Sequence, residues 1–115
     1  MEQKSFNKQD SINLKDPEKI LHSSRKEIDQ IDSEIIDLIQ RRTSLAKDIV
    51  LSKLALDMDI LDDSREKLIY EKLEKLANDK NLNQNTKNSV FQIMDILINL
   101  SKKEQEEIII DNWIL

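Results

Sequence analysis

The 115-residue chain contains no glycine, and this absence constrains its fold more than any other feature. Phosphate-binding loops need glycine where the backbone approaches the ligand, and tight β-hairpins need it for positive φ angles. Walker loops, dinucleotide-binding fingerprints and most small β-barrels are therefore excluded. The chain also lacks cysteine, which excludes disulfides, zinc knuckles and thiol nucleophiles and suits a reducing compartment.

Charge and hydropathy narrow the class of partner. Asp and Glu outnumber Lys and Arg by 23 to 18, and a net charge of −5 argues against general nucleic-acid binding. No apolar run approaches the roughly 20 residues that span a bilayer. The first 16 residues lack the apolar core of a secretory signal. With one histidine, His22, no metal site is expected. We expect a helical, cytoplasmic protein with no membrane or nucleic-acid partner.

Helix signals begin after a polar segment. Residues 1–16 are rich in Lys, Gln, Asn and Ser without a sustained period, which predicts a flexible N-terminal tail. Asp16, Pro17 and Glu18 then combine a capping residue, a proline suited to the first helical position and an acid near the positive end of the helix dipole. A helix is predicted to begin there.

An apolar stripe with alternating spacings of three and four follows, typical of a helix–helix seam. No helix breaker interrupts it before about Asp57, which predicts one helix of roughly 40 residues and, at about 1.5 Å per residue, near 60 Å long. Such a rod exceeds the diameter of a single globule of this size, so a second chain is expected to cover it. The stripe consists of Leu21, Ile28, Ile31, Ile35, Leu38, Leu45 and Ile49.

Two further helices are predicted. The run Asp62-Asp63-Ser64-Arg65-Glu66 indicates a helix start, with Asp63 and Glu66 at capping-box spacing. Residues 78–86 contain four asparagines and predict the next connection, because asparagine tolerates turn conformations usually given to glycine. The last helix is expected to end near Ile108. The apolar tail at 108–115 is expected to pack on the body or on a partner.

Polar side chains interrupt the apolar faces. Arg42 occupies a seam position, Lys53 projects from nearly the same face three turns later, and Ser101 and Gln105 share one face of the last helix. Each has a bland interpretation by itself: a cation that reaches solvent, a polar residue that fixes helix register or, at 65–66, a cap with a surface ion pair. Together they predict a pocket for a small anion with more than one carboxylate. Because Ser101 has no nearby histidine, we expect binding and electrostatics rather than nucleophilic catalysis.

Three short motifs occur along the chain, and their order and spacing together are specific. They are Arg25-x-x-Ile28-Asp29-x-Ile31-Asp32 continuing to Arg42-x-x-Leu45-Ala46-x-x-Ile49-x-x-x-Lys53, then Asp62-x-x-Arg65-Glu66, then Ser101-x-x-x-Gln105. Over residues 17–107 the chain resembles the all-helical (AroQ-class) chorismate mutases. The resemblance implies an all-α fold of three helices per chain, the first very long, in an intertwined homodimeric bundle. It also implies an isomerase that converts chorismate to prephenate in phenylalanine and tyrosine biosynthesis, without metal or cofactor.

The resemblance implies that each active site is shared between two chains. Arg25 of the partner chain and Arg42 would hold the two carboxylates of chorismate, with Ser101 assisting at one of them. Helix geometry agrees, because Arg25 and Arg42 are 17 residues apart, about 25 Å along one helix. The two arginines of a single chain cannot both bind one small ligand, whereas an antiparallel partner helix would bring Arg25 of one chain close to Arg42 of the other.

The remaining roles implied by the resemblance concern the reacting atoms. Lys53 and Gln105 would donate hydrogen bonds to the ether oxygen, and Glu66 would accept one from the ring hydroxyl. Arg65 and the backbone around Asp62 would help to close and order the site. The expected catalytic residues are therefore Lys53, Gln105, Glu66 and, holding a carboxylate, Arg42.

The register of the last helix has two solutions. About three extra residues lie near 83–87 relative to the family pattern. Aligning Phe91 with the family's aromatic residue would move the Ser and Gln positions to Ile98 and Lys102. We favour Ser101 and Gln105, because they restore both polar types.

Three other functions are compatible with parts of the sequence. An isochorismate pyruvate lyase uses a similar pocket on the same fold. A non-catalytic helical dimerisation or regulatory module would keep the fold without turnover. A plain coiled coil explains least, because it predicts neither Arg42 in the seam nor the Ser101 and Gln105 pair.

Overall fold

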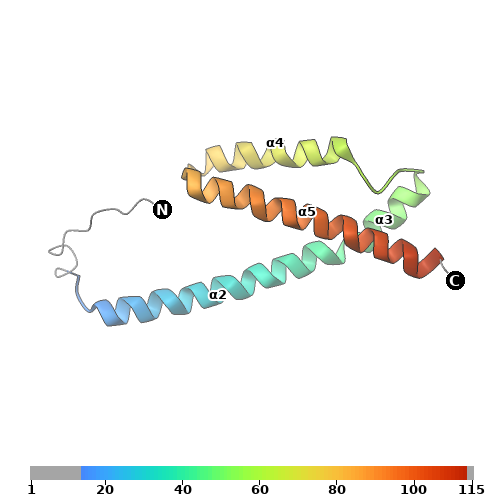
Figure 1. Ribbon diagram of the computed structural model, residues 1–115. Coiled ribbons are helices and arrows are strands. Elements are labelled where there is room, and N and C mark those ends of the chain that lie inside the picture. Colours follow the sequence, from blue (N-terminus) through green and yellow to red (C-terminus); the bar gives the residue numbers. More distant parts are fainter. Residues whose placement is uncertain (1–13, 114–115) are drawn as a thin grey trace. The chain divides into compact units, whose positions relative to one another are not determined.

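The computed structural model describes residues 14–113, and all regular structure within them is helical (Figure 1). Four segments follow one another: α2 (Pro17–Ser44), α3 (Ala46–Ala55), α4 (Asp63–Asp79) and α5 (Gln84–Trp113). The all-α prediction is confirmed, with α2 and α3 together forming the long first helix. Residues 1–13 of the expected N-terminal tail and 114–115 of the expected C-terminal tail lie outside the described residues.

The chain divides into two units between Asp37 and Leu38. In the first unit α2 begins as predicted, with Asp16 Oδ1 accepting the backbone N–H of Lys19 at 3.3 Å and Pro17 in the first helical position. No residue of α2 is buried. The apolar stripe of this unit is open to solvent, and Ile28, for example, is 54% exposed.

The predicted long first helix is confirmed, but it bends: a single turn residue, Leu45, separates α2 from α3. Two hydroxyl side chains bond back to carbonyls of the preceding turn: Thr43 Oγ1 to Ile39 at 2.8 Å and Ser44 Oγ to Arg41 at 2.7 Å. Such back-bonding competes with the regular ladder and bends helices. The Leu45 N–H accordingly bonds to Arg42, three residues back.

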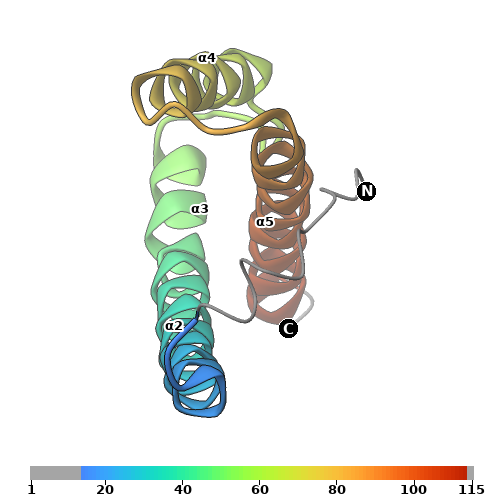
Figure 2. The same cartoon turned by 90° about the vertical axis from the view of Figure 1, so that its left-hand side faces the viewer.

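In the second unit α3 and α4 both pack against α5. Figure 2 shows α3 and α5 running beside each other, and Figure 1 shows α4 alongside α5. The alternating apolar spacing of these helices supplies the small core, because positions three and four apart share one face. The buried apolar residues are Ala46, Val50, Ala77 and Ile98.

Both connections in this unit end a helix with the same hydrogen-bond pattern. After α3 the N–H of Met58 bonds to Lys53 O at 2.7 Å, and after α4 the N–H of Leu82 bonds to Ala77 O at 3.0 Å. These are Schellman motifs, which need one residue with positive φ and usually place glycine there. Here Asp57 (φ 56°) and Asn81 (φ 52°) take that position. The prediction that asparagine replaces glycine in the second connection is confirmed.

Three polar contacts cross from α4 to α5. Glu66 pairs with Lys102 at 3.3 Å, the Tyr70 hydroxyl donates to Asp95 Oδ1, and Glu74 pairs with Lys87 at 2.5 Å. Residues 66, 70 and 74 are spaced by four and so share one face of α4. The Tyr70 ring also stacks on Phe91, with centroids 6.2 Å apart. These contacts set how α5 lies along α4.

Two helix ends differ from the sequence prediction. The N-cap of α4 is Asp62, whose side chain accepts the Arg65 N–H, so the cap lies one residue before the predicted Asp63. Helix α5 continues past Ile108 to Trp113. Within residues 14–113 we find no helix with the length and apolar character that crossing a bilayer requires.

Candidate active site

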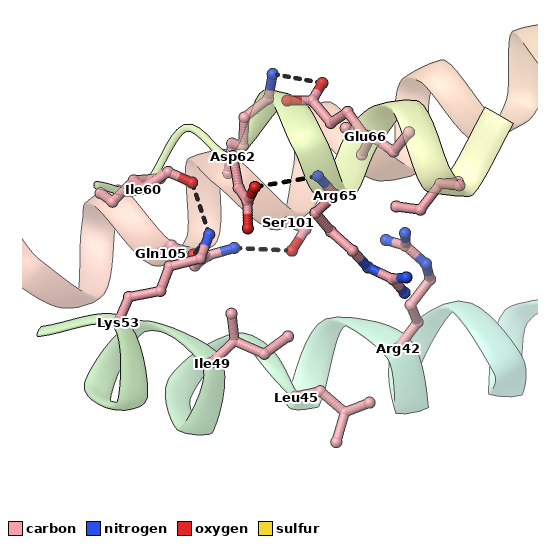
Figure 3. Close-up of a pocket in the computed structure, with 13 residues that line it drawn as sticks. Arg42, Leu45, Ile49, Lys53, Ile60, Asp62, Arg65, Glu66, Ser101 and Gln105 are labelled. Carbon is pink, nitrogen blue, oxygen red and sulfur yellow. Dashed lines mark hydrogen bonds and ion pairs between the residues drawn. The ribbon is translucent and has the colours of Figure 1, made fainter. Parts of the chain in front are cut away.

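A cavity of about 460 Å³ lies within the second unit, lined from α3, α4, α5, the end of α2 and the α3–α4 connection (Figure 3). This volume is in the usual range for small-molecule sites. Its apolar wall consists of Leu45, Ile49, Ile60, Ile69 and Ile98. Its polar residues are Arg42, Lys53, Asp62, Arg65, Glu66, Ser101, Lys102 and Gln105.

The charge of this lining is opposite to that of the chain. Four cationic side chains and two carboxylates face the cavity, an excess of two positive charges, whereas the whole chain carries a net charge of −5. Local excess charge of one sign in a concave site attracts ligands of the other sign. The cavity therefore suits a small dianion.

Lys53, Gln105 and Ser101 form a hydrogen-bonded chain across the cavity. Lys53 Nζ donates to Gln105 Oε1 at 2.9 Å, and Gln105 Nε2 donates to Ser101 Oγ at 3.1 Å. Gln105 is only 3% exposed, and both of its polar atoms are satisfied. Burying an amide without partners is costly, so these two hydrogen bonds fix the orientation of the Gln105 amide.

The α3–α4 connection is tied to Lys53 at two atoms. The Lys53 carbonyl accepts the N–H of Met58, and Lys53 Nζ donates to the Ile60 carbonyl at 2.6 Å. An ammonium group has three N–H donors. Two of them are used within the described part of the chain, at Ile60 and Gln105, which leaves one that a ligand oxygen can accept.

Arg42 and Arg65 face the cavity from different helices (Figure 3). Half-buried Arg42 donates from one guanidinium nitrogen to the Leu97 carbonyl of α5 at 2.9 Å. A guanidinium has five N–H donors in a planar fork, so the remaining ones can bind a carboxylate. Arg65 is in the first turn of α4, which Asp62 caps at 3.0 Å. That cap therefore positions both Arg65 and the next residue, Glu66.

The cavity brings together seven of the eight residues singled out from the sequence. The eighth, Arg25, lies in the first unit, on the exposed surface of α2, and does not line the cavity. For the third helix, Ser101 and Gln105 form the polar chain, while Ile98 is buried in the apolar wall. The geometry shows where these residues lie, and their roles stay predictions.

Sequence reasoning missed two contributors. Ile60 offers a backbone carbonyl, and no side-chain pattern signals a backbone contact. Lys102 lines the cavity and pairs with Glu66. From the sequence alone, Lys102 was named only as the alternative to Gln105. Its spacing, one residue from Ser101 and three from Gln105, was the signal that could have placed it at the cavity.

The fold and this cavity define a class: an all-helical protein with a cationic cavity that suits a small dianion. Comparison with known proteins names the family. Residues 24–106 match the family model described as chorismate mutase type II. Because this match covers most of the chain, the chain belongs to the chorismate mutase type II family.

Two curated relatives agree with this assignment. The chain is 44% identical over 70 residues to a chorismate mutase of Methanocaldococcus jannaschii, covering 61% of this chain and 71% of that protein. It is 39% identical over 74 residues to a bifunctional chorismate mutase/prephenate dehydratase of Buchnera aphidicola subsp. Schizaphis graminum, covering 64% of this chain but 19% of that longer protein. No solved structure matches the chain significantly.

Proposed function

We propose that this chain is a chorismate mutase, an isomerase that converts chorismate to prephenate, and that the cationic cavity of the second unit is its active site. Family membership supports the reaction. The observation that carries the assignment of the site is the hydrogen bond from half-buried Lys53 to buried Gln105, in a cavity with two excess positive charges. Prephenate is the precursor from which phenylalanine and tyrosine are made.

The reaction requires no covalent bond between the substrate and the protein. In this Claisen rearrangement a C–O bond breaks and a C–C bond forms within one molecule, so both reacting ends are already present. The protein must select the folded conformer in which the two carbons approach. Arg42 and Ser101 would hold carboxylate oxygens, and the apolar wall would enclose the ring. Glu66 would accept a hydrogen bond from the ring hydroxyl and so fix the orientation of the ring.

The second task is to stabilise the negative charge that grows on the ether oxygen as the C–O bond breaks. Lys53 has one N–H beyond those given to Ile60 and Gln105, and Gln105 has a second amide hydrogen beyond the one given to Ser101. These two donors would meet the ether oxygen. Because both groups are already oriented by partners, little reorganisation is needed during the reaction.

The active unit in this proposal is a homodimer. Support comes from the uncovered apolar stripe of α2 and from Arg25, which is absent from the cavity lining although the family resemblance implies a carboxylate contact. A second copy that covers the stripe would supply Arg25 to the first copy's cavity. A cytoplasmic location is likewise our prediction, to be tested by cell fractionation.

The test is ultraviolet measurement of chorismate loss by the purified protein, with the product identified and isochorismate assayed in parallel. Prephenate formation is the expected result. Salicylate and pyruvate from isochorismate would instead assign a lyase. A folded protein that converts neither compound would overturn catalysis at this cavity.

A further inference from the structure

The Glu66–Lys102 pair joins the cavity wall of α4 to that of α5. Lys102 Nζ lies 3.3 Å from Glu66 Oε1, and both residues line the cavity. Their side chains are 28% and 23% exposed, so the pair is partly shielded from water. A shielded ion pair is screened less by salt than a surface one.

The pair constrains a side chain that would otherwise rotate. Glutamate has three side-chain torsions, and fixing them in the free protein reduces the ordering needed on binding. Lys102 engages Oε1, which leaves Oε2 to accept a hydrogen bond. Ser101, which accepts a hydrogen bond from Gln105, and Lys102, which donates one to Glu66, are adjacent on α5. The same turn of α5 therefore orients both Gln105 and Glu66.

We propose that Lys102 is a positioning residue of this active site, which holds the Glu66 carboxylate where it accepts the ring hydroxyl of the substrate. This inference rests on the proposed function and assigns a role to a residue outside the motifs found in the sequence. Lys102 acts through Glu66 rather than on the reacting atoms.

A second ion pair between the same helices provides a matched comparison. Lys87 and Glu74 also join α5 to α4, at 2.5 Å, but neither residue lines the cavity. If the Lys102 pair only fastened the helices, losing either pair would have the same consequence. Lys103, exposed and next to Lys102, controls for the loss of one positive charge near the site.

The experiment measures kcat and KM for chorismate in Lys102→Gln, Lys102→Arg, Lys87→Gln and Lys103→Gln, each checked for helicity by circular dichroism. We expect Lys102→Gln to lower kcat/KM by about fivefold to tenfold. The loss should fall mainly on KM, because the hydroxyl contact is present before and during the reaction. Lys102→Arg keeps the charge and should stay within about twofold of wild type, as should both control variants. Lys102→Met serves as a second variant if the glutamine protein folds poorly.

Combination with Glu66→Gln tests the route of action. If Lys102 acts through Glu66, adding Lys102→Gln to Glu66→Gln should change kcat/KM by less than about twofold. An equal loss in both backgrounds would mean that Lys102 acts directly, and equal losses in the Lys102 and Lys87 variants would mean a purely structural clamp. Either result, or an unaltered Lys102→Gln, overturns this inference while leaving the mutase assignment intact. A wild-type protein inactive on chorismate overturns both.

Discussion

Residues 17–37 of α2 expose an apolar stripe, whereas the unit that begins at Leu38 buries the amide of Gln105. In the first unit Ile28 is 54% and Ile35 48% exposed. In the second, Gln105 is 3% exposed and makes two side-chain hydrogen bonds. Among the described residues both units leave large apolar side chains exposed, and the second unit in addition withdraws a polar group from water.

Residues whose burial does not match their polarity have two different explanations here, one for exposed apolar residues and one for a buried polar residue. An exposed apolar stripe larger than scattered single residues marks an association surface, which is where we propose that a second copy binds. A buried amide among apolar walls is costly unless its polar atoms have partners, so Gln105 marks a site whose geometry is fixed. The following predictions test these two interpretations, from the largest expected effect to the smallest.

Lys53→Ala should have the largest effect. Removing one preoriented donor at a developing oxyanion typically lowers kcat by about 10²–10³, and the lysine also carries a charge, so we expect a loss in or beyond that range. Steady-state turnover of chorismate measures it. Lys47→Ala, an exposed lysine on α3, is the matched control. Near-normal turnover by the Lys53 variant would contradict the assignment of the site.

Gln105→Glu should make activity depend on pH. The amide donates hydrogen bonds at any pH, whereas a carboxyl group can donate only when protonated. We expect kcat to fall by about 10² near pH 8 and to recover partly on acidification. The wild type should keep its activity as the pH rises from about 5 to about 7. Exposed Gln92 on α5 provides the control, Gln92→Glu, and a wild type that loses activity sharply over that range would speak against the assigned role.

Arg25→Ala tests whether the first unit of one copy supplies Arg25 to the cavity in the second unit of the other copy. Losing a carboxylate contact should lower kcat/KM by about 10-fold to 100-fold. In a shared site, co-expression with the Lys53→Ala chain creates mixed dimers that contain one intact site. Random pairing would then restore about one quarter of wild-type activity. Complementation that fails in confirmed mixed dimers would show that Arg25 does not serve the partner's cavity.

Tyr70→Phe should have the smallest effect, on stability only. The hydrogen bond to Asp95, then desolvation and the negative charges of Asp95 and Glu66, raise the pKa of Tyr70 above its ordinary value of 10.0. Because the folded-state pKa is the higher one, this contact stabilises fully below pH 10 and is lost as the pH rises through the raised value.

We therefore expect the variant to melt about 2–4 °C below wild type at neutral pH, with the gap closing under alkaline conditions. Thermal melts between about pH 7 and about pH 11 measure this. A gap that widened with pH would contradict the sign of the pKa shift.

Local signals made much of the fold predictable. The start of α2 followed from Asp16 and Pro17, and the end of α4 from its asparagines, because caps and turns depend on a few adjacent residues. The break at Leu45 was not predictable in the same way. Thr43 and Ser44 could have bonded to solvent, and only the packed helix decides that their hydroxyls bond to backbone carbonyls.

The candidate site was predictable where spacing placed side chains on one helix face. Arg42, Lys53, Ser101 and Gln105 all entered from such spacing and all line the cavity. The contact from Lys53 to the Ile60 carbonyl could not be predicted from spacing, since every residue has a backbone carbonyl. The pairing of Lys102 with Glu66 was found only from the structure, because the angle between α4 and α5 decides which of several lysines reaches that carboxylate.

The positive φ angles at Asp57 and Asn81 have a consequence for the denatured state. A left-handed backbone costs a residue with a side chain roughly 1–2 kcal/mol, although Asp and Asn tolerate it better than most. Glycine would remove that strain but would give the unfolded chain more conformations to lose. By using none, the sequence narrows its unfolded ensemble along its whole length and confines the strain to isolated turn positions. Glycine introduced at either turn would exchange native strain for denatured-state entropy.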